Sequence, residues 1–159
     1  MRRRELDQRY RTRKLTDPEF ELLLEVDRDN TAWLAEEVGA RGWPLRSQVG
    51  EEGALAAWLL AQHADAAPAV QRELHAAMAR ALAAGEASPA HFAYLEDRVR
   101  VNAGRPQLYG TQFHGQGDGF APQPIEDPAR LDERRASVGL EPFAEYEAFI
   151  RAIDKERGS

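Results

Sequence analysis

Prolines and glycines divide this chain into helix-length segments. Five prolines open runs in which apolar residues recur every three to four positions: Pro18, Pro68, Pro89, Pro128 and Pro142. Four glycines close such runs: Gly39, Gly85, Gly104 and Gly139. Because proline is favoured in the first turn of a helix and glycine just past its end, this spacing predicts a mainly α-helical chain. The most apolar segment, residues 51–64, is expected to be a buried central helix.

Residues 105–126 interrupt the helical pattern with four glycines and three prolines. Two apolar arms, 108–113 and 120–125, flank Gly-Gln-Gly-Asp-Gly at 115–119, which is typical of a hairpin tip. The prolines of the second arm permit only an edge strand. We therefore predict one domain over residues 1–159, a helical bundle of about six helices with one small β-hairpin or ordered loop near residues 107–125.

Composition excludes several classes of protein. The chain has no cysteine, so it has no disulfide, no thiolate nucleophile and no cysteine-based zinc site. No stretch approaches the roughly 18 apolar residues of a membrane span, and no apolar segment of a secretory signal follows the basic start. We expect a soluble, cytoplasmic protein that does not bind membranes.

Charge is uneven along the 159 residues. Residues 1–14 contain seven basic and two acidic side chains, whereas residues 15–159 carry a net charge of −11. Nucleic-acid binding needs a basic face on the folded domain, so the acidic body disfavours it. We interpret residues 1–14 as a basic helix or arm, either solvated or docked on the body, and keep nucleic-acid binding through it as a minor alternative.

His63 is the candidate catalytic residue. Helical spacing places Gln62 on the stripe of Leu55 and Leu59, with His63 about 40° from Leu59, so two polar side chains end a buried helix on its inward side. Buried amides and imidazoles need hydrogen-bond partners. His63 is either a core histidine satisfied by the backbone or by one carboxylate, or a general base.

Polar residues also continue the apolar stripes of two later helices, and we predict that three of them bind ligand: Gln71, Arg98 and Asn102. The alternative for Arg98 and Asn102 is pairing with the last carbonyls of their own helix.

Residues 102–112 form a polar segment whose shape is fixed by glycine and proline, which suits ligand recognition. Arg105 offers a planar fork for a carboxylate or phosphate. The other predicted ligand-binding residues here are Gln107, Tyr109, Thr111 and Gln112. The alternative is a loop that uses these groups to satisfy its own backbone.

Familiar motifs are absent from the sequence. It has no phosphate-binding loop, no nucleophile elbow and no ligand spacing among its four histidines, so we predict no metal and no cofactor, and keep a zinc site built from histidines and carboxylates as a minor alternative. Asp7 and Arg11 are spaced as an ordinary helical ion pair, and residues 132–135, Asp-Glu-Arg-Arg, predict a solvated helix face.

Several segments resemble a bacterial domain family of unknown function. They are Gly42-Trp43-Pro44, Ala57 to Asp65 with its Gln-His-Ala-Asp end, Ala93 to Val99, Gly104 to Gln112 with its Gly-Arg-Pro-Gln start, and Val138-Gly139-Leu140. The resemblance spans nearly the whole chain and implies no activity. It favours one site made from the end of the 51–65 helix and the 102–112 loop.

From these features we expect a small-molecule-binding helical domain that acts on a small polar or anionic metabolite by acid–base chemistry without a metal. His63 would move the proton, Gln62 and Gln71 would bind and orient the ligand, and Arg98 and Arg105 would hold negative charge. The alternative is a non-catalytic adaptor that binds a protein partner through loop 102–125, whose Phe113, Phe120 and Pro122 suit an interface.

Overall fold

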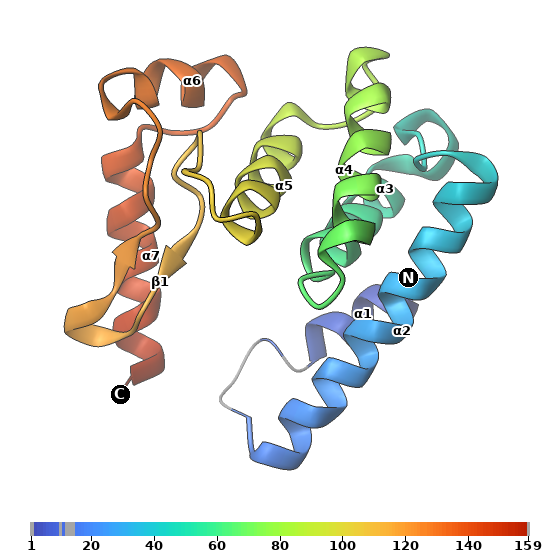
Figure 1. Cartoon of the computed structure of the whole chain (residues 1–159), viewed down its shortest axis with the longest axis horizontal. Coiled ribbons are helices and arrows are strands. Elements are labelled where there is room, and N and C mark those ends of the chain that lie inside the picture. Colours follow the sequence, from blue (N-terminus) through green and yellow to red (C-terminus); the bar gives the residue numbers. More distant parts are fainter. Residues whose placement is uncertain (1, 10, 12–14, 159) are drawn as a thin grey trace. The chain divides into compact units, whose positions relative to one another are not determined.

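The computed structural model of the chain describes residues 2–9, 11 and 15–158 (Figure 1). Its contacts divide the chain into two compact units, Met1–Ser88 and Pro89–Ser159, which we describe separately. The structure confirms a mainly α-helical chain with one small antiparallel hairpin, and the described residues form seven α-helices where about six were predicted. One domain across residues 1–159 stays a prediction. None of the helices in the described ranges has the length and apolar character needed to span a membrane.

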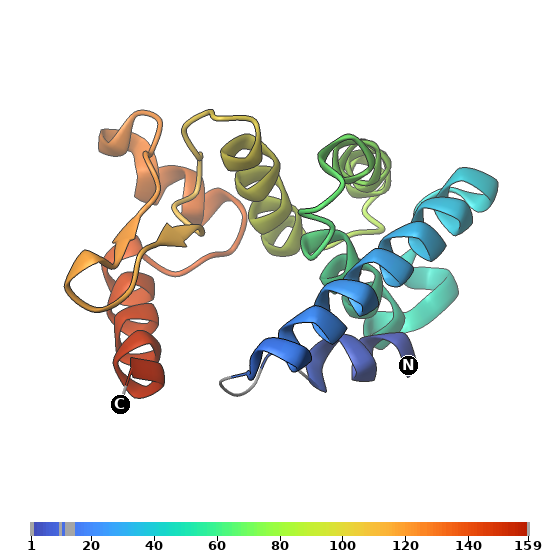
Figure 2. The same cartoon turned by 60° about the horizontal axis from the view of Figure 1, so that its bottom comes forward.

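The first unit contains four helices, α1 (Arg2–Arg9), α2 (Asp17–Arg41), α3 (Arg46–Gln62) and α4 (Pro68–Ala83). Helix α1 lies against α2 and α3, and α4 packs on the same two helices (Figures 1 and 2). Small and branched apolar side chains fill the space between them, including Leu34, Leu60, Ala61, Leu74, Ala77 and Met78. Alanine at positions 61 and 77 leaves little side-chain volume between the helices.

Helix α3 differs from the prediction at its start. Residues 46–49 form a helical turn before Gly50, whose φ of 71° breaks the helix, and the remainder begins at residue 51 as expected. The added turn is held by Glu86, because the Ser47 N–H donates to its carboxylate at 2.9 Å and the Arg46 N–H to its carbonyl at 3.1 Å. This partner is 39 residues from Ser47, so no local pattern reveals the turn.

The second unit contains α5 (Pro89–Asn102), β1 (Phe113–His114), the 3-10 helix η1 (Gly117–Gly119), β2 (Ala121–Pro122), the 3-10 helix η2 (Pro128–Arg130), α6 (Leu131–Ser137) and α7 (Phe143–Gly158). The strands pair antiparallel, with Phe113 opposite Pro122. Helix α7 lies beside η1 at the hairpin tip (Figure 2). The predicted hairpin and the proline-led helix starts are confirmed.

Candidate functional site

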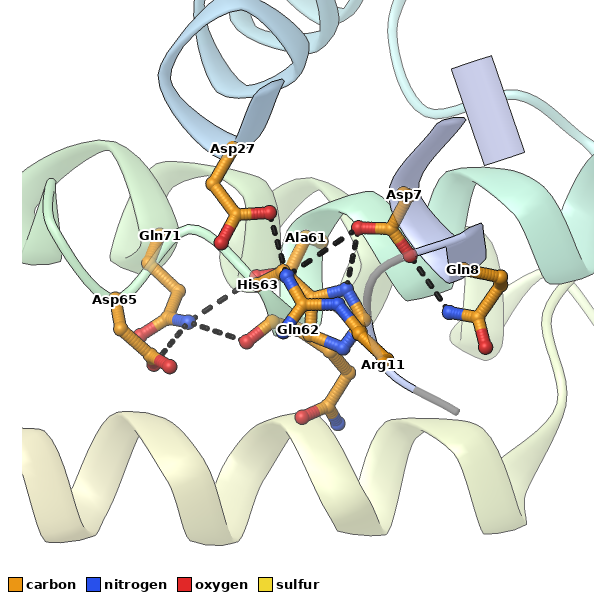
Figure 3. A network of polar contacts seen from close by, with 9 residues as sticks. All are labelled: Asp7, Gln8, Arg11, Asp27, Ala61, Gln62, His63, Asp65 and Gln71. Atoms are coloured by element: carbon orange, nitrogen blue, oxygen red, sulfur yellow. Dashed lines mark hydrogen bonds and ion pairs between the residues drawn. The ribbon is translucent and has the colours of Figure 1, made fainter. Parts of the chain in front are cut away.

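His63 lies at the C-cap of α3, directly after Gln62, the last helical residue. Its Nδ1 atom is 2.7 Å from Oδ1 of Asp7, which α1 supplies from 56 residues earlier in the chain (Figure 3). The helix end therefore presents the imidazole to a carboxylate on a different element. The histidine is satisfied by one carboxylate, which is also the arrangement that orients a general base.

Asp7 is fully buried and has two further partners. Gln8 Nε2 donates to its Oδ2 at 2.6 Å, and Arg11 approaches its Oδ1 at 3.5 Å. Burial on its own would raise the pKa of Asp7, but the hydrogen bond and charge of His63, followed by Gln8 and Arg11, outweigh it and hold this pKa below its ordinary value. Asp7 is therefore an ionised acceptor inside the first unit.

Arg11 connects Asp7 to a second carboxylate. Its terminal nitrogen donates to Oδ1 of Asp27, on α2, at 2.5 Å. Burial raises the pKa of Asp27, and the Arg11 contact offsets only part of that effect. Asp7, Asp27 and His63 each present one ligand atom, and these atoms all lie within 4.8 Å of one another. The group combines proton-transfer chemistry with a donor set that fits a metal ion.

Gln71 and Gln62, both predicted to bind ligand, are buried at the same helix end. The amide of Gln71 donates to the carbonyls of Ala61 at 3.1 Å and Gln62 at 3.3 Å, and to Oδ1 of Asp65 at 3.2 Å. It thus fixes the backbone immediately before His63. The side chain of Gln62 points away from the Asp7 and Asp27 carboxylates (Figure 3).

In the second unit, the 102–112 segment wraps around Asp97, a fully buried residue of α5. Its carboxylate accepts the backbone N–H groups of Leu108, Tyr109 and Thr111 at 2.6–3.1 Å and the Thr111 hydroxyl at 3.0 Å. Burial raises the pKa of Asp97, and these hydrogen bonds counteract it only in part. The carboxylate therefore organises the loop.

Gln107 is also fully buried, and its side chain forms hydrogen bonds to the backbone of the same loop and to that of Gln123. Its Nε2 donates to the carbonyls of Gln112 and Gln123 at 2.9 Å, and its Oε1 accepts the N–H of Gln112 at 2.8 Å. Thr111 is committed to Asp97, and the N–H of Tyr109 is bound by the same carboxylate. These contacts are the ones expected if the loop satisfies its own backbone.

The remaining predicted ligand-binding residues lie nearer the surface. Arg98 Nε donates to the side-chain oxygen of Gln112 at 3.1 Å, and the Gln112 amide donates to the Thr111 hydroxyl at 2.9 Å. Asn102 and Arg105 are exposed. Within the described ranges, the Arg105 guanidinium forms no hydrogen bond or ion pair, so of these residues it fits an anion-binding role best.

The predicted solvated face at residues 132–135 is wrong for Arg135, which is fully buried. Its guanidinium donates to the carbonyls of Tyr109 and Glu141 at 2.6 Å and lies 4.9 Å from the ring centre of Tyr146. A run of four charged residues predicts a solvated helix, but the carbonyls of two loops accept hydrogen bonds from this cation inside the unit, and its remaining terminal nitrogen lies 3.8 Å from the Glu141 carboxylate.

The aromatic residues suggested for a partner surface are half-buried in the second unit. Phe113 stacks on Phe120 with ring centres 5.2 Å apart and on Phe143 of α7 at 6.3 Å. They therefore contribute to the packing of the hairpin, and an adaptor surface on residues 102–125 stays a prediction.

The structure brings Gln62, His63 and Gln71 together in the first unit, and the seven predicted residues from Arg98 to Gln112 belong to the second. One pocket joining the two groups stays a prediction. The sequence did not indicate that Asp7, Arg11 and Asp27 lie beside His63. The available signal was the Asp7–Arg11 spacing, which was interpreted as an ordinary ion pair and which the structure forms at 3.5 Å.

Comparison with known proteins gives one match. No curated protein and no solved structure matches the chain. A family model described as "Family of unknown function (DUF6624)" matches residues 7–158, which include both compact units. The match agrees with the resemblance to an uncharacterised domain family. The chain therefore belongs to the DUF6624 family.

Proposed function

We propose that this chain binds a small polar or anionic metabolite beside His63 and acts on it by acid–base chemistry, with Asp7 as the residue that positions the imidazole. The observation that carries the proposal is the 2.7 Å contact between His63 Nδ1 and the fully buried Asp7 carboxylate.

An ionised carboxylate at Nδ1 selects the tautomer that keeps a proton on that nitrogen. The lone pair of Nε2 is then available to take a proton from a bound molecule. His63 retains 15% of its side-chain exposure, so solvent and a small ligand can reach the ring.

The surroundings support a fixed geometry. Gln8 and Arg11 hold Asp7, and Gln71 holds the carbonyls that precede His63. A base fixed by such contacts reacts without first being ordered, which is how enzymes lower the entropic part of a barrier.

The test is conversion of compounds in a mixed pool of small metabolites, followed by mass spectrometry. We expect the wild-type chain to deplete at least one polar compound, and expect His63→Gln to abolish that conversion at unchanged circular dichroism. Asp7→Asn should lower it by a factor of about 10²–10⁴, the range attributed to general acid–base groups and their orienting partners.

His75→Gln is the matched control, because His75 is a half-buried histidine of α4 outside the Asp7 cluster. It should convert the pool like the wild type. Equal conversion by wild type and His63→Gln would contradict the proposal, as would conversion by none of the three folded proteins.

A further inference from the structure

The polar cluster of the first unit contains two carboxylates and an imidazole but only one guanidinium, that of Arg11. One oxygen of Asp7, one oxygen of Asp27 and one ring nitrogen of His63 lie within 4.8 Å of one another. We infer that these three side chains form a binding site for a divalent transition-metal ion, and that Arg11 is the group that leaves when the ion binds.

The geometry of the cluster allows all three side chains to bind one ion. The three residues come from α1, α2 and the C-cap of α3, so three separate elements converge on one point (Figure 3). Nitrogen and oxygen ligands of a tetrahedral ion, bound at about 2.0–2.2 Å, lie about 3.3–3.6 Å apart, so side-chain movements of about 1 Å bring the three atoms into that range. Asp7 is fully buried, whereas Asp27 and His63 keep a solvent-exposed edge, so an ion has a route to the site.

The two carboxylates favour a divalent ion over the singly charged guanidinium of Arg11. The Arg11 nitrogen lies 2.5 Å from Asp27 and 3.5 Å from Asp7, so both carboxylates already converge on one positive group. Two carboxylates and one guanidinium leave a net charge of −1 when the imidazole is neutral. A divalent ion in place of the guanidinium balances the pair, and buried charges are stable when they are paired or coordinate a metal.

The donor types select the class of metal. Imidazole suits zinc, copper, iron and nickel, whereas magnesium and calcium take oxygen ligands almost alone. Three protein ligands also leave a fourth position open, as in zinc sites that bind water or substrate. Zinc is therefore the probe of choice, with magnesium as the contrasting ion.

Metal binding and the proposed acid–base role use the same nitrogen. An ion on His63 Nδ1 takes the atom that faces Asp7 and forces the ring proton onto Nε2, which removes the base. Inhibition of metabolite conversion by zinc is thus a consequence that rests on the proposed function. Binding itself does not, so the experiment measures binding directly.

The test is isothermal titration of the full chain, without an affinity tag, with Zn²⁺ and with Mg²⁺. We expect one equivalent of Zn²⁺ to bind and Mg²⁺ to bind at least tenfold more weakly. Asp27→Asn and His63→Gln should each weaken Zn²⁺ binding at least tenfold. Arg11→Gln should strengthen it severalfold, because the competing guanidinium is removed.

Asp29→Asn and His75→Gln are the matched controls. Asp29 lies on the same helix as Asp27 but is exposed and pairs with Arg3, and His75 lies outside the cluster. Both variants should bind Zn²⁺ like the wild type. Absence of a one-to-one site, or equal affinity of Asp27→Asn and Asp29→Asn, would overturn the inference, as would weaker binding by Arg11→Gln.

Circular dichroism of each variant without metal separates loss of binding from loss of fold. If Asp27→Asn or His63→Gln does not fold, the site is tested instead by the visible absorption of Co²⁺ added to the wild-type chain. Absorption bands typical of Co²⁺ with nitrogen and oxygen ligands support the site if they disappear when Zn²⁺ is added. A spectrum equal to that of free Co²⁺ rejects it.

Discussion

The buried carboxylate of Asp97 accepts two hydrogen bonds from Thr111, one from its backbone N–H and one from its hydroxyl, both at 3.0 Å. Two more N–H groups, those of Leu108 and Tyr109, meet the same carboxylate. A single side chain of α5 therefore satisfies four donors of this glycine- and proline-bounded loop.

Removing the Asp97 carboxylate should destabilise the fold. Asp97→Ala leaves four donors without their acceptor, and we expect the free energy of unfolding to fall by at least about 3 kcal/mol. Thr111→Val removes the hydroxyl, which donates to Asp97 and accepts from the Gln112 amide, and should cost about 1–2 kcal/mol. Urea unfolding followed by circular dichroism measures both, and equal losses in the two variants would show that Asp97 does not organise the loop.

Asp97 also predicts a pH dependence of stability. Because burial raises its pKa above the ordinary value of 3.8, the folded chain binds this proton more tightly than the unfolded chain. Its contribution to stability is therefore greatest at or below that ordinary value and falls as the pH rises through the folded pKa.

The measurement compares the wild type with Asp97→Asn, which does not titrate, in urea at several pH values from neutral to about 4. We expect the stability of the wild type relative to the variant to be constant near neutral pH and to increase on acidification. A decrease on acidification would mean that the hydrogen bonds lower the pKa of Asp97 by more than burial raises it.

Two glycines of the hairpin tip form a matched pair for a test of the turn. Both have positive φ, 78° at Gly115 and 54° at Gly117. A Cβ at Gly115 would meet the carbonyl oxygen of Gly119 at 2.2 Å, whereas a Cβ at Gly117 meets nothing within 4 Å.

We expect Gly117→Ala to cost about 1 kcal/mol through its backbone conformation alone. Gly115→Ala should cost at least about 2 kcal/mol because the clash with backbone is added. Thermal unfolding of the two variants gives the comparison, and equal losses would contradict the close approach at Gly115.

Sequence reasoning succeeded where the causes of structure are local. Proline at the first turn and glycine after the last turn act within a few residues, so the starts of α4 and α5 were predictable. The Gly-Gln-Gly-Asp-Gly tip likewise fixes its own hairpin. The turn before Gly50 combines local hydrogen bonds to the Leu45 carbonyl with long-range contacts to Glu86, and the long-range contacts were not predictable.

The candidate site shows the same difference between local features, which were predictable, and contacts between distant residues, which were not. The pattern of one helix indicated that His63 needs a polar partner, but the partner is 56 residues away in α1. Arg135 stands in a run of charged residues that is typical of a solvated surface, and loops at Tyr109 and Glu141 bury it. Pairings between separate elements leave no periodic signal in one sequence.

The central claim is that Asp7 fixes the His63 ring with its proton on Nδ1. The most direct measurement is long-range ¹H–¹⁵N correlation spectroscopy of the His63 ring in its neutral form, in the wild type and in Asp7→Asn. We predict a protonated Nδ1 and a bare Nε2 in the wild type, and loss of this preference in the variant. A wild-type ring that carries its proton on Nε2, or the same preference in both proteins, would contradict the account.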